Sequence, residues 1–169
     1  MGSNQTCVTL FLLLILSRNL AQTDANIVDQ TCKQTPHYHL CLKFLNSDPR
    51  SSTADVTGLA LILVDLLKNE TTKSVQFVKQ LRGKRPDLEK PLKSCDSDYD
   101  AILTADVPEA IQALELGNPR FAEDGMNDVD IEATSCENEF GIEKSPLFDS
   151  NKLLTDISHV DSSIIRQLL

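Results

Sequence analysis

The sequence has no tryptophan, few glycines, only three histidines, and no sustained alternation of β-branched and polar residues. The missing alternation argues against a β-sheet protein. An enzyme needs a nucleophile, a base and a group that orients them, yet no histidine lies at a recognised catalytic spacing from a serine or an acid. His37 and His39, two residues apart, would face different directions on a helix. We therefore expect no enzyme, no metal site and no cofactor.

Positive charge is also scarce, with 16 basic against 25 acidic side chains and a formal charge of −9. This balance disfavours nucleic acid as a partner, because nucleic-acid binding needs a basic surface, and it gives no attraction to anionic membranes. The net charge approaches zero as the pH falls toward the pI of about 4.7. Association with a charged partner should then meet less long-range repulsion in mild acid.

The one long apolar run lies at the N-terminus, from Val8 to Leu16. It is shorter than the roughly 20 residues that cross a bilayer. We interpret residues 1–21 as a secretory signal peptide cleaved after Ala21, with cleavage after Ala25 as the alternative. Its n-region lacks Lys and Arg before Val8, and the alternative is a buried N-terminal helix. No later stretch is long and apolar enough to span a membrane, so the mature protein should be soluble.

Apolar residues recur at helical spacing in four segments of the mature chain. Pro108 lies inside the second of them and removes one backbone hydrogen bond, so a kink is expected near Ala105–Pro108. Short connections containing Gly or Pro predict an all-α, up-down-up-down four-helix bundle over residues 51–169. Residues 22–50 predict a hairpin of two short helices broken at Pro36, within one domain of residues 22–169. The four segments are 56–81, 88–114, 122–140 and 145–168.

Cleavage after Ala21 removes Cys7 and leaves four cysteines, an even number that argues for disulfides in an oxidising compartment. Four cysteines allow three pairings. Cys32 and Cys41 flank Pro36, while Cys95 and Cys136 lie on the apolar faces of the second and third helices. The most local pairing is therefore Cys32–Cys41 with Cys95–Cys136. Neither spacing matches a zinc pattern.

Pro119-Arg120-Phe121 places one cation and one aromatic ring at the expected start of a helix. Asn118 suits the N-cap position and Pro119 the first helical position. A guanidinium and a ring held on a rigid first turn could enter a pocket lined by carboxylates. The alternative is an ordinary helix start, with a solvated Arg120 and a Phe121 that faces the core.

Asn69-Glu70-Thr71 is an acceptor sequence for N-glycosylation in a secreted chain. Because it lies inside an expected helix, the alternative is that it is skipped.

Several segments together resemble the plant invertase and pectin methylesterase inhibitor family. The resemblance covers nearly all of the mature chain and implies a four-helix bundle with an N-terminal helical hairpin and two disulfides. The segments are Thr31–Pro36, Leu40–Leu42, Ser47–Ser51, Gly58–Asp65, Pro91–Cys95, Ala105–Ala110, Pro119–Gly125 and Ile164–Leu169.

The resemblance also favours one branch of the family. Invertase inhibitors carry Pro-Lys-Phe between two bundle helices and insert it into the sucrose-binding cleft of the target. Pro119, Arg120 and Phe121 match those positions, with arginine in place of lysine. The resemblance thus implies a one-to-one complex with plant acid invertase, in the apoplast and cell wall or in the vacuole. The alternatives are an inhibitor of pectin methylesterase and a bundle with a structural or ligand-carrying role.

Overall fold

The computed structural model describes residues 27–141 and 145–169. The expected signal peptide, residues 1–21, lies outside these ranges. Within them, no helix is both long and apolar enough to cross a membrane.

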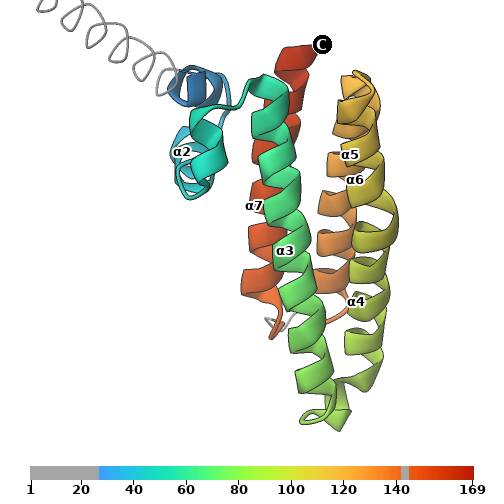
Figure 1. Cartoon of the computed structure of the whole chain (residues 1–169). Helices are drawn as coiled ribbons and strands as arrows, with labels where there is room; N and C mark the ends of the chain where they lie inside the picture. Colours follow the sequence, from blue (N-terminus) through green and yellow to red (C-terminus); the bar gives the residue numbers. More distant parts are fainter. Residues whose placement is uncertain (1–26, 142–144) are drawn as a thin grey trace, which may run out of the picture.

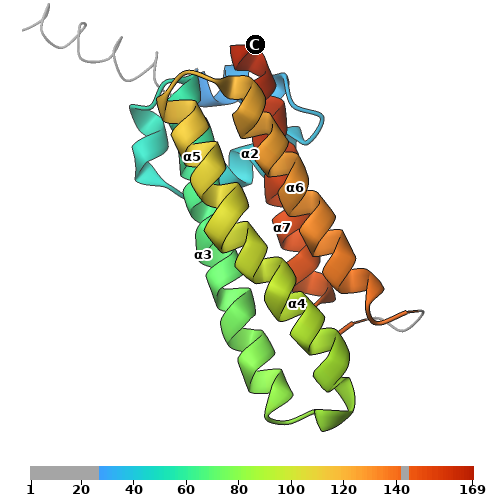
Figure 2. The ribbon, with the colours of Figure 1, turned by 90° about the vertical axis from the view of Figure 1, so that its right-hand side faces the viewer.

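Four antiparallel helical rods make up the bundle, and successive rods run back and forth along its length (Figures 1 and 2). The fold class predicted from the sequence is confirmed. The first rod is α3 (Val56–Arg82), the third is α6 (Pro119–Asn138), and the fourth is α7 (Phe148–Ile165) with the short η4 (Arg166–Leu168). The second rod consists of α4 (Glu89–Ala101), η3 (Ile102–Asp106) and α5 (Val107–Glu115), and a 3-10 turn, η2 (Pro86–Leu88), precedes it.

Local sequence explains where α3 begins and ends. The carboxylate of Asp55 accepts a hydrogen bond from the Gly58 amide (2.7 Å), which caps one of the free N–H groups of the first turn. Gly83 occupies the C-cap and Pro86 follows, as the sequence predicted. Apolar residues on more than one face of α3 are buried, because this helix packs against α7 on one side and α4 and α5 on another.

The second rod is irregular at the place where the sequence predicted a kink. Residues Ile102–Asp106 form a π-helical segment directly ahead of Pro108. A π turn widens the helix and changes the backbone pairing by one residue, which accommodates the N–H that Pro108 lacks. The sequence located this irregularity, and the structure gives its form.

A helical hairpin lies beside one end of the bundle (Figure 1). Residues 27–33 and α2 (Tyr38–Leu45) form its two helices, and the Cys32–Cys41 disulfide joins them. The side-chain amide of Gln167 donates a hydrogen bond to the backbone carbonyl of Thr31 (3.1 Å), which attaches the C-terminal end of the chain to the hairpin.

A second link runs from the end of α2 to α3 through the turn η1 (Pro49–Ser52). The guanidinium of Arg50 pairs with Asp48 and, across the turn, with Asp65 of α3, each at 2.7 Å. These exposed pairs add little stability, but they connect the turn η1 to α3.

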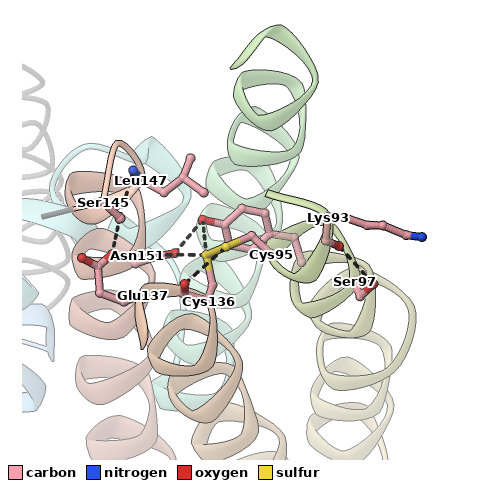
Figure 3. Close-up of a disulfide and its surroundings, with 9 residues drawn as sticks. Lys93, Cys95, Ser97, Cys136, Glu137, Ser145, Leu147 and Asn151 are labelled. Atoms are coloured by element: carbon pink, nitrogen blue, oxygen red, sulfur yellow. Dashed lines mark hydrogen bonds between the residues drawn. A yellow bond between two sulfur atoms is a disulfide. The ribbon is translucent and has the colours of Figure 1, made fainter. Parts of the chain in front are cut away.

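The Cys95–Cys136 disulfide joins α4 to α6 (Figure 3). Beside it, the Tyr99 hydroxyl donates to Asn151 Oδ1 (2.5 Å), and Asn151 Nδ2 donates to the Glu137 carboxylate (3.0 Å). A buried group of hydrogen-bonded side chains thus connects α4, α6 and α7. Both disulfides are those of the most local pairing.

Candidate functional site

A three-residue turn between α5 and α6 positions the tripeptide. Gly117 has φ +71°, a left-handed conformation that strains other residues. The backbone N–H of Asn118 donates a hydrogen bond to the Ala113 carbonyl (2.8 Å), and the backbone N–H of Gly117 donates one to the Leu114 carbonyl (3.2 Å). This pattern is the Schellman motif, which ends a helix and satisfies its last carbonyls. This turn therefore ends α5 and fixes the direction in which α6 begins.

The first turn of α6 begins where the sequence predicted, with Asn118 at the N-cap and Pro119 at the first helical position. The Asn118 side chain makes no capping hydrogen bond, contrary to the usual behaviour of this residue. Its backbone explains this, because ψ is 68° and not the extended value that aims the side chain at the helix. The Asn118 carbonyl accepts the Phe121 and Ala122 amides instead (3.1 and 3.4 Å).

Phe121 faces solvent, with 58% of its surface exposed, and does not belong to the core. The buried stripe of α6 starts one residue later, at Ala122, and continues through Met126. Leu116, on the other side of the turn, is 67% exposed. The alternative in which Phe121 is a core residue is therefore wrong.

Arg120 is exposed and has no ion pair with any part of the chain that the structure describes. Glu123, three residues later on the same helix and within reach of such a pairing, is held instead by Arg166 (Nε to Oε1, 2.6 Å). All the other arginines of the described ranges contact carboxylates. They are Arg50, Arg82, Arg85 and Arg166.

A shallow hollow lies against Phe121, between the end of α5 and the start of α6. Leu116 and Phe121 form its apolar sides, and Glu109, Gln112 and Asn118 add polar groups. The site is thus a projecting turn with one free cation, one exposed ring and a small hollow of mixed polarity. Such a surface can contact a carboxylate and an apolar wall at once, but it contains no group arranged for catalysis.

Two other kinds of site were considered, a glycosylation site at Asn69 and a metal site. Asn69 is exposed in the middle of α3, but the hydroxyl of Thr71 is buried and donates to the Leu67 carbonyl (2.9 Å). Glycosylation at Asn69 stays a prediction. Cys95, Asp98 and Cys136 are close enough to suggest a metal group, but both sulfurs belong to the disulfide and offer no thiolate.

Sequence reasoning missed a group of carboxylates between the second rod and α6, which we call the acidic seam: Asp98, Asp106, Asp128 and Glu132. Burial, with the neighbouring Asp128, Glu132 and Glu109, raises the pKa of Asp106 to about 7. Burial and a hydrogen bond with Glu132 raise the pKa of Asp98 to about 6. The eight-residue spacing of Asp98 and Asp106 places them on one helical face, a signal that the sequence did contain.

Comparison with known proteins gives consistent matches. The family model for plant invertase/pectin methylesterase inhibitor matches residues 26–168. The chain is 45% identical over 142 residues to cell wall / vacuolar inhibitor of fructosidase 1 of Arabidopsis thaliana, covering 84% of this chain and 69% of the relative. It is 34% identical over 116 residues to inhibitor of fructosidase 2 of the same plant, covering 63% and 64%.

A solved structure agrees in fold. A mutant form of a pectin methylesterase inhibitor from Arabidopsis superposes with a TM-score of 0.71 over 82% of this chain and 94% of its own, at 19% identity. This likeness concerns the fold alone. From the family match over residues 26–168 and the identity to the fructosidase inhibitors, the chain belongs to the plant invertase/pectin methylesterase inhibitor family.

Proposed function

We propose that this protein is a secreted inhibitor of plant acid invertase that occludes the sucrose-binding site with Pro119, Arg120 and Phe121. The observation that carries the proposal is the unpaired, exposed Arg120 beside the exposed ring of Phe121 on a rigid turn. Two relatives are named as inhibitors of fructosidase, the kind of enzyme that cleaves sucrose. The resemblance of this tripeptide to the Pro-Lys-Phe of invertase inhibitors points to the same contact.

The physical basis of inhibition is competition for charge. Acid invertase, by the same resemblance, is a retaining glycosidase with a carboxylate nucleophile and a carboxylic general acid, and its transition state carries positive charge on the sugar. The Arg120 guanidinium would occupy the place of that charge and hydrogen-bond both carboxyl groups. Phe121 would pack on the apolar wall of the cleft. Such a complex is one-to-one and involves no chemistry on the inhibitor.

The proposal also covers the processing of the chain, its domain limits and its location. Residues 1–21 are removed as a signal peptide, and residues 22–169 form the inhibitor domain, with the hairpin in residues 22–50 and the bundle in residues 51–169. The mature protein then acts in the apoplast or the vacuole, against a cell-wall or a vacuolar invertase. The two disulfides suit an oxidising compartment.

The test is a pair of inhibition assays with the mature chain, residues 22–169. We expect inhibition of acid invertase that weakens as sucrose concentration rises, and no inhibition of pectin methylesterase. Inhibition of pectin methylesterase alone would replace the proposal with the other activity of the family. Inhibition of invertase that is independent of sucrose would contradict occlusion of the active site.

A further inference from the structure

The positive charge that this acidic chain does possess is concentrated at one end of the bundle. Residues 79–93 comprise the last residues of α3, the turn η2 and the first residues of α4. This segment, which we call the basic end, contains six basic and two acidic side chains. This segment therefore carries a charge of +4 in a chain whose net charge is −9. A local field of this kind can bind an anionic partner although the protein as a whole would repel it.

Ion pairs within the basic end leave its lysines free. Arg82 holds Glu89 (2.5 Å) and Asp96 (3.5 Å), and Arg85 holds Asp87 (2.6 Å). Each acid of the segment is thus neutralised by an arginine. Four exposed lysines have no carboxylate within 4.0 Å anywhere in residues 27–141 and 145–169, and they carry the excess charge. They are Lys79, Lys84, Lys90 and Lys93.

Two of these lysines, Lys79 and Lys93, line a groove between α3 and α4. The groove also contains the Ser97 hydroxyl, Asp96, which Arg82 holds, and the exposed Asp100. It therefore combines ammonium groups with a hydroxyl and carboxylates. This mixture suits a ligand that has well-separated carboxylates and many hydroxyl groups, because Asp100, which has no ion pair within residues 27–141 and 145–169, would repel a dense row of phosphates.

The basic end and the tripeptide lie at opposite ends of the molecule. Figure 2 shows the α3–α4 connection at the far end of the bundle from the α5–α6 connection. The 27 residues of α3 span about 40 Å at 1.5 Å per residue. A ligand at one end therefore leaves the other end accessible.

We propose that the basic end binds a linear acidic polysaccharide, a polymer of uronate sugars, through Lys79, Lys84, Lys90 and Lys93. The disulfides indicate an oxidising compartment outside the cytosol, where the anionic cytoplasmic membrane leaflet and nucleic acids are not the polyanions in contact with the protein. A polysaccharide bound there would hold the inhibitor in place and leave the tripeptide free to enter an enzyme.

The experiment measures retention of the mature chain on immobilised polygalacturonate, with neutral dextran as the control matrix. We expect binding to polygalacturonate alone, and its loss by about 0.3 M NaCl, because screening at that ionic strength removes most of the attraction between exposed charges. Binding that persists in high salt would overturn the proposal, as would equal retention on dextran.

Two triple variants locate the site. Lys84→Gln/Lys90→Gln/Lys93→Gln should weaken binding by about tenfold or more. Lys33→Gln/Lys43→Gln/Lys152→Gln makes the same change in net charge on other surfaces, and it should retain binding within about twofold. Equal losses in the two variants would refute a local site. Tighter binding of the native chain to RNA or to phosphatidylserine vesicles than to polygalacturonate would also overturn it. The assay contains no enzyme, so its outcome does not depend on the inhibitory function.

Discussion

Neutralising one carboxylate of the acidic seam should stabilise the protein at neutral pH. Asp106 is 7% exposed, and its Oδ2 atom is buried without a hydrogen-bond partner. A Cβ atom at Gly125 would lie 3.0 Å from the Asp106 carbonyl oxygen, so α6 packs closely against η3 there. The carboxylate therefore has few ways to recover its hydration, and it faces Asp128 and Glu132 of α6 and Glu109 of α5.

The size of the expected change in the free energy of unfolding follows from the pKa of Asp106. Asp106 changes from an ordinary pKa of 3.8 to about 7 in the folded chain, a difference worth about 4 kcal/mol at most. Because water partly solvates the acidic seam, we expect the free-energy cost of ionised Asp106 to be about 2 kcal/mol. Because the folded pKa is the higher one, the favourable contribution is complete below pH 3.8 and is lost as the pH rises through 7.

Urea unfolding followed by circular dichroism tests this directly. Asp106→Asn should raise the free energy of unfolding by about 2 kcal/mol at pH 7.5 and by about 0.5 kcal/mol at pH 4. Asp100→Asn, which neutralises an exposed carboxylate of α4, is the matched control and should change little at either pH. Destabilisation by Asp106→Asn at pH 7.5, or an equal gain at both pH values, would refute the reasoning.

Three further outcomes are expected. Replacing Cys95 and Cys136 together by serine should lower the free energy of unfolding by about 2–5 kcal/mol in a urea titration, because this bond closes a 41-residue separation; an unchanged midpoint would contradict the pairing. Phe121→Ala should weaken inhibition of invertase by about 1–3 kcal/mol with no shift in melting temperature, because the ring is exposed; a large drop in melting temperature would place the ring in the core. Binding to invertase should be tighter in mild acid than at neutral pH, and the difference should shrink in high salt; affinity that rises steadily up to neutral pH would contradict the charge argument.

The helices were predictable from the sequence because their signals are local. The leucine and valine spacing after Val56 and the breakers Gly83 and Pro86 define α3 without any tertiary information. Gly141 and Ser145 likewise lie in the connection between α6 and α7, although α6 ends at Asn138 and α7 begins at Phe148, each two or three residues from the predicted limit. Even the irregular turn ahead of Pro108 was located, since the missing N–H is a property of one residue.

Features that depend on contacts between helices were harder to predict from the sequence. The sequence placed Arg120 and Phe121 at a helix start but left open whether the ring faced the core, since this depends on the direction in which Gly117 turns the chain. The pairing of Glu123 with Arg166 joins residues 43 positions apart and leaves Arg120 free. The spacing of Asp98 and Asp106 indicated a shared face of the second rod, but the approach of Asp128 and Glu132 to that face depends on how α6 packs against η3, which no spacing within one helix contains.

The measurement that tests the central claim most directly is the inhibition constant of Arg120 variants against acid invertase. Arg120→Ala should weaken inhibition by about 2–5 kcal/mol, and Arg120→Lys, which keeps the charge, should lose much less. Lys84→Ala removes one positive charge from the opposite end and should inhibit like the native chain. Native inhibition by Arg120→Ala, with the fold intact, would contradict the assignment of this tripeptide to the active site of the enzyme.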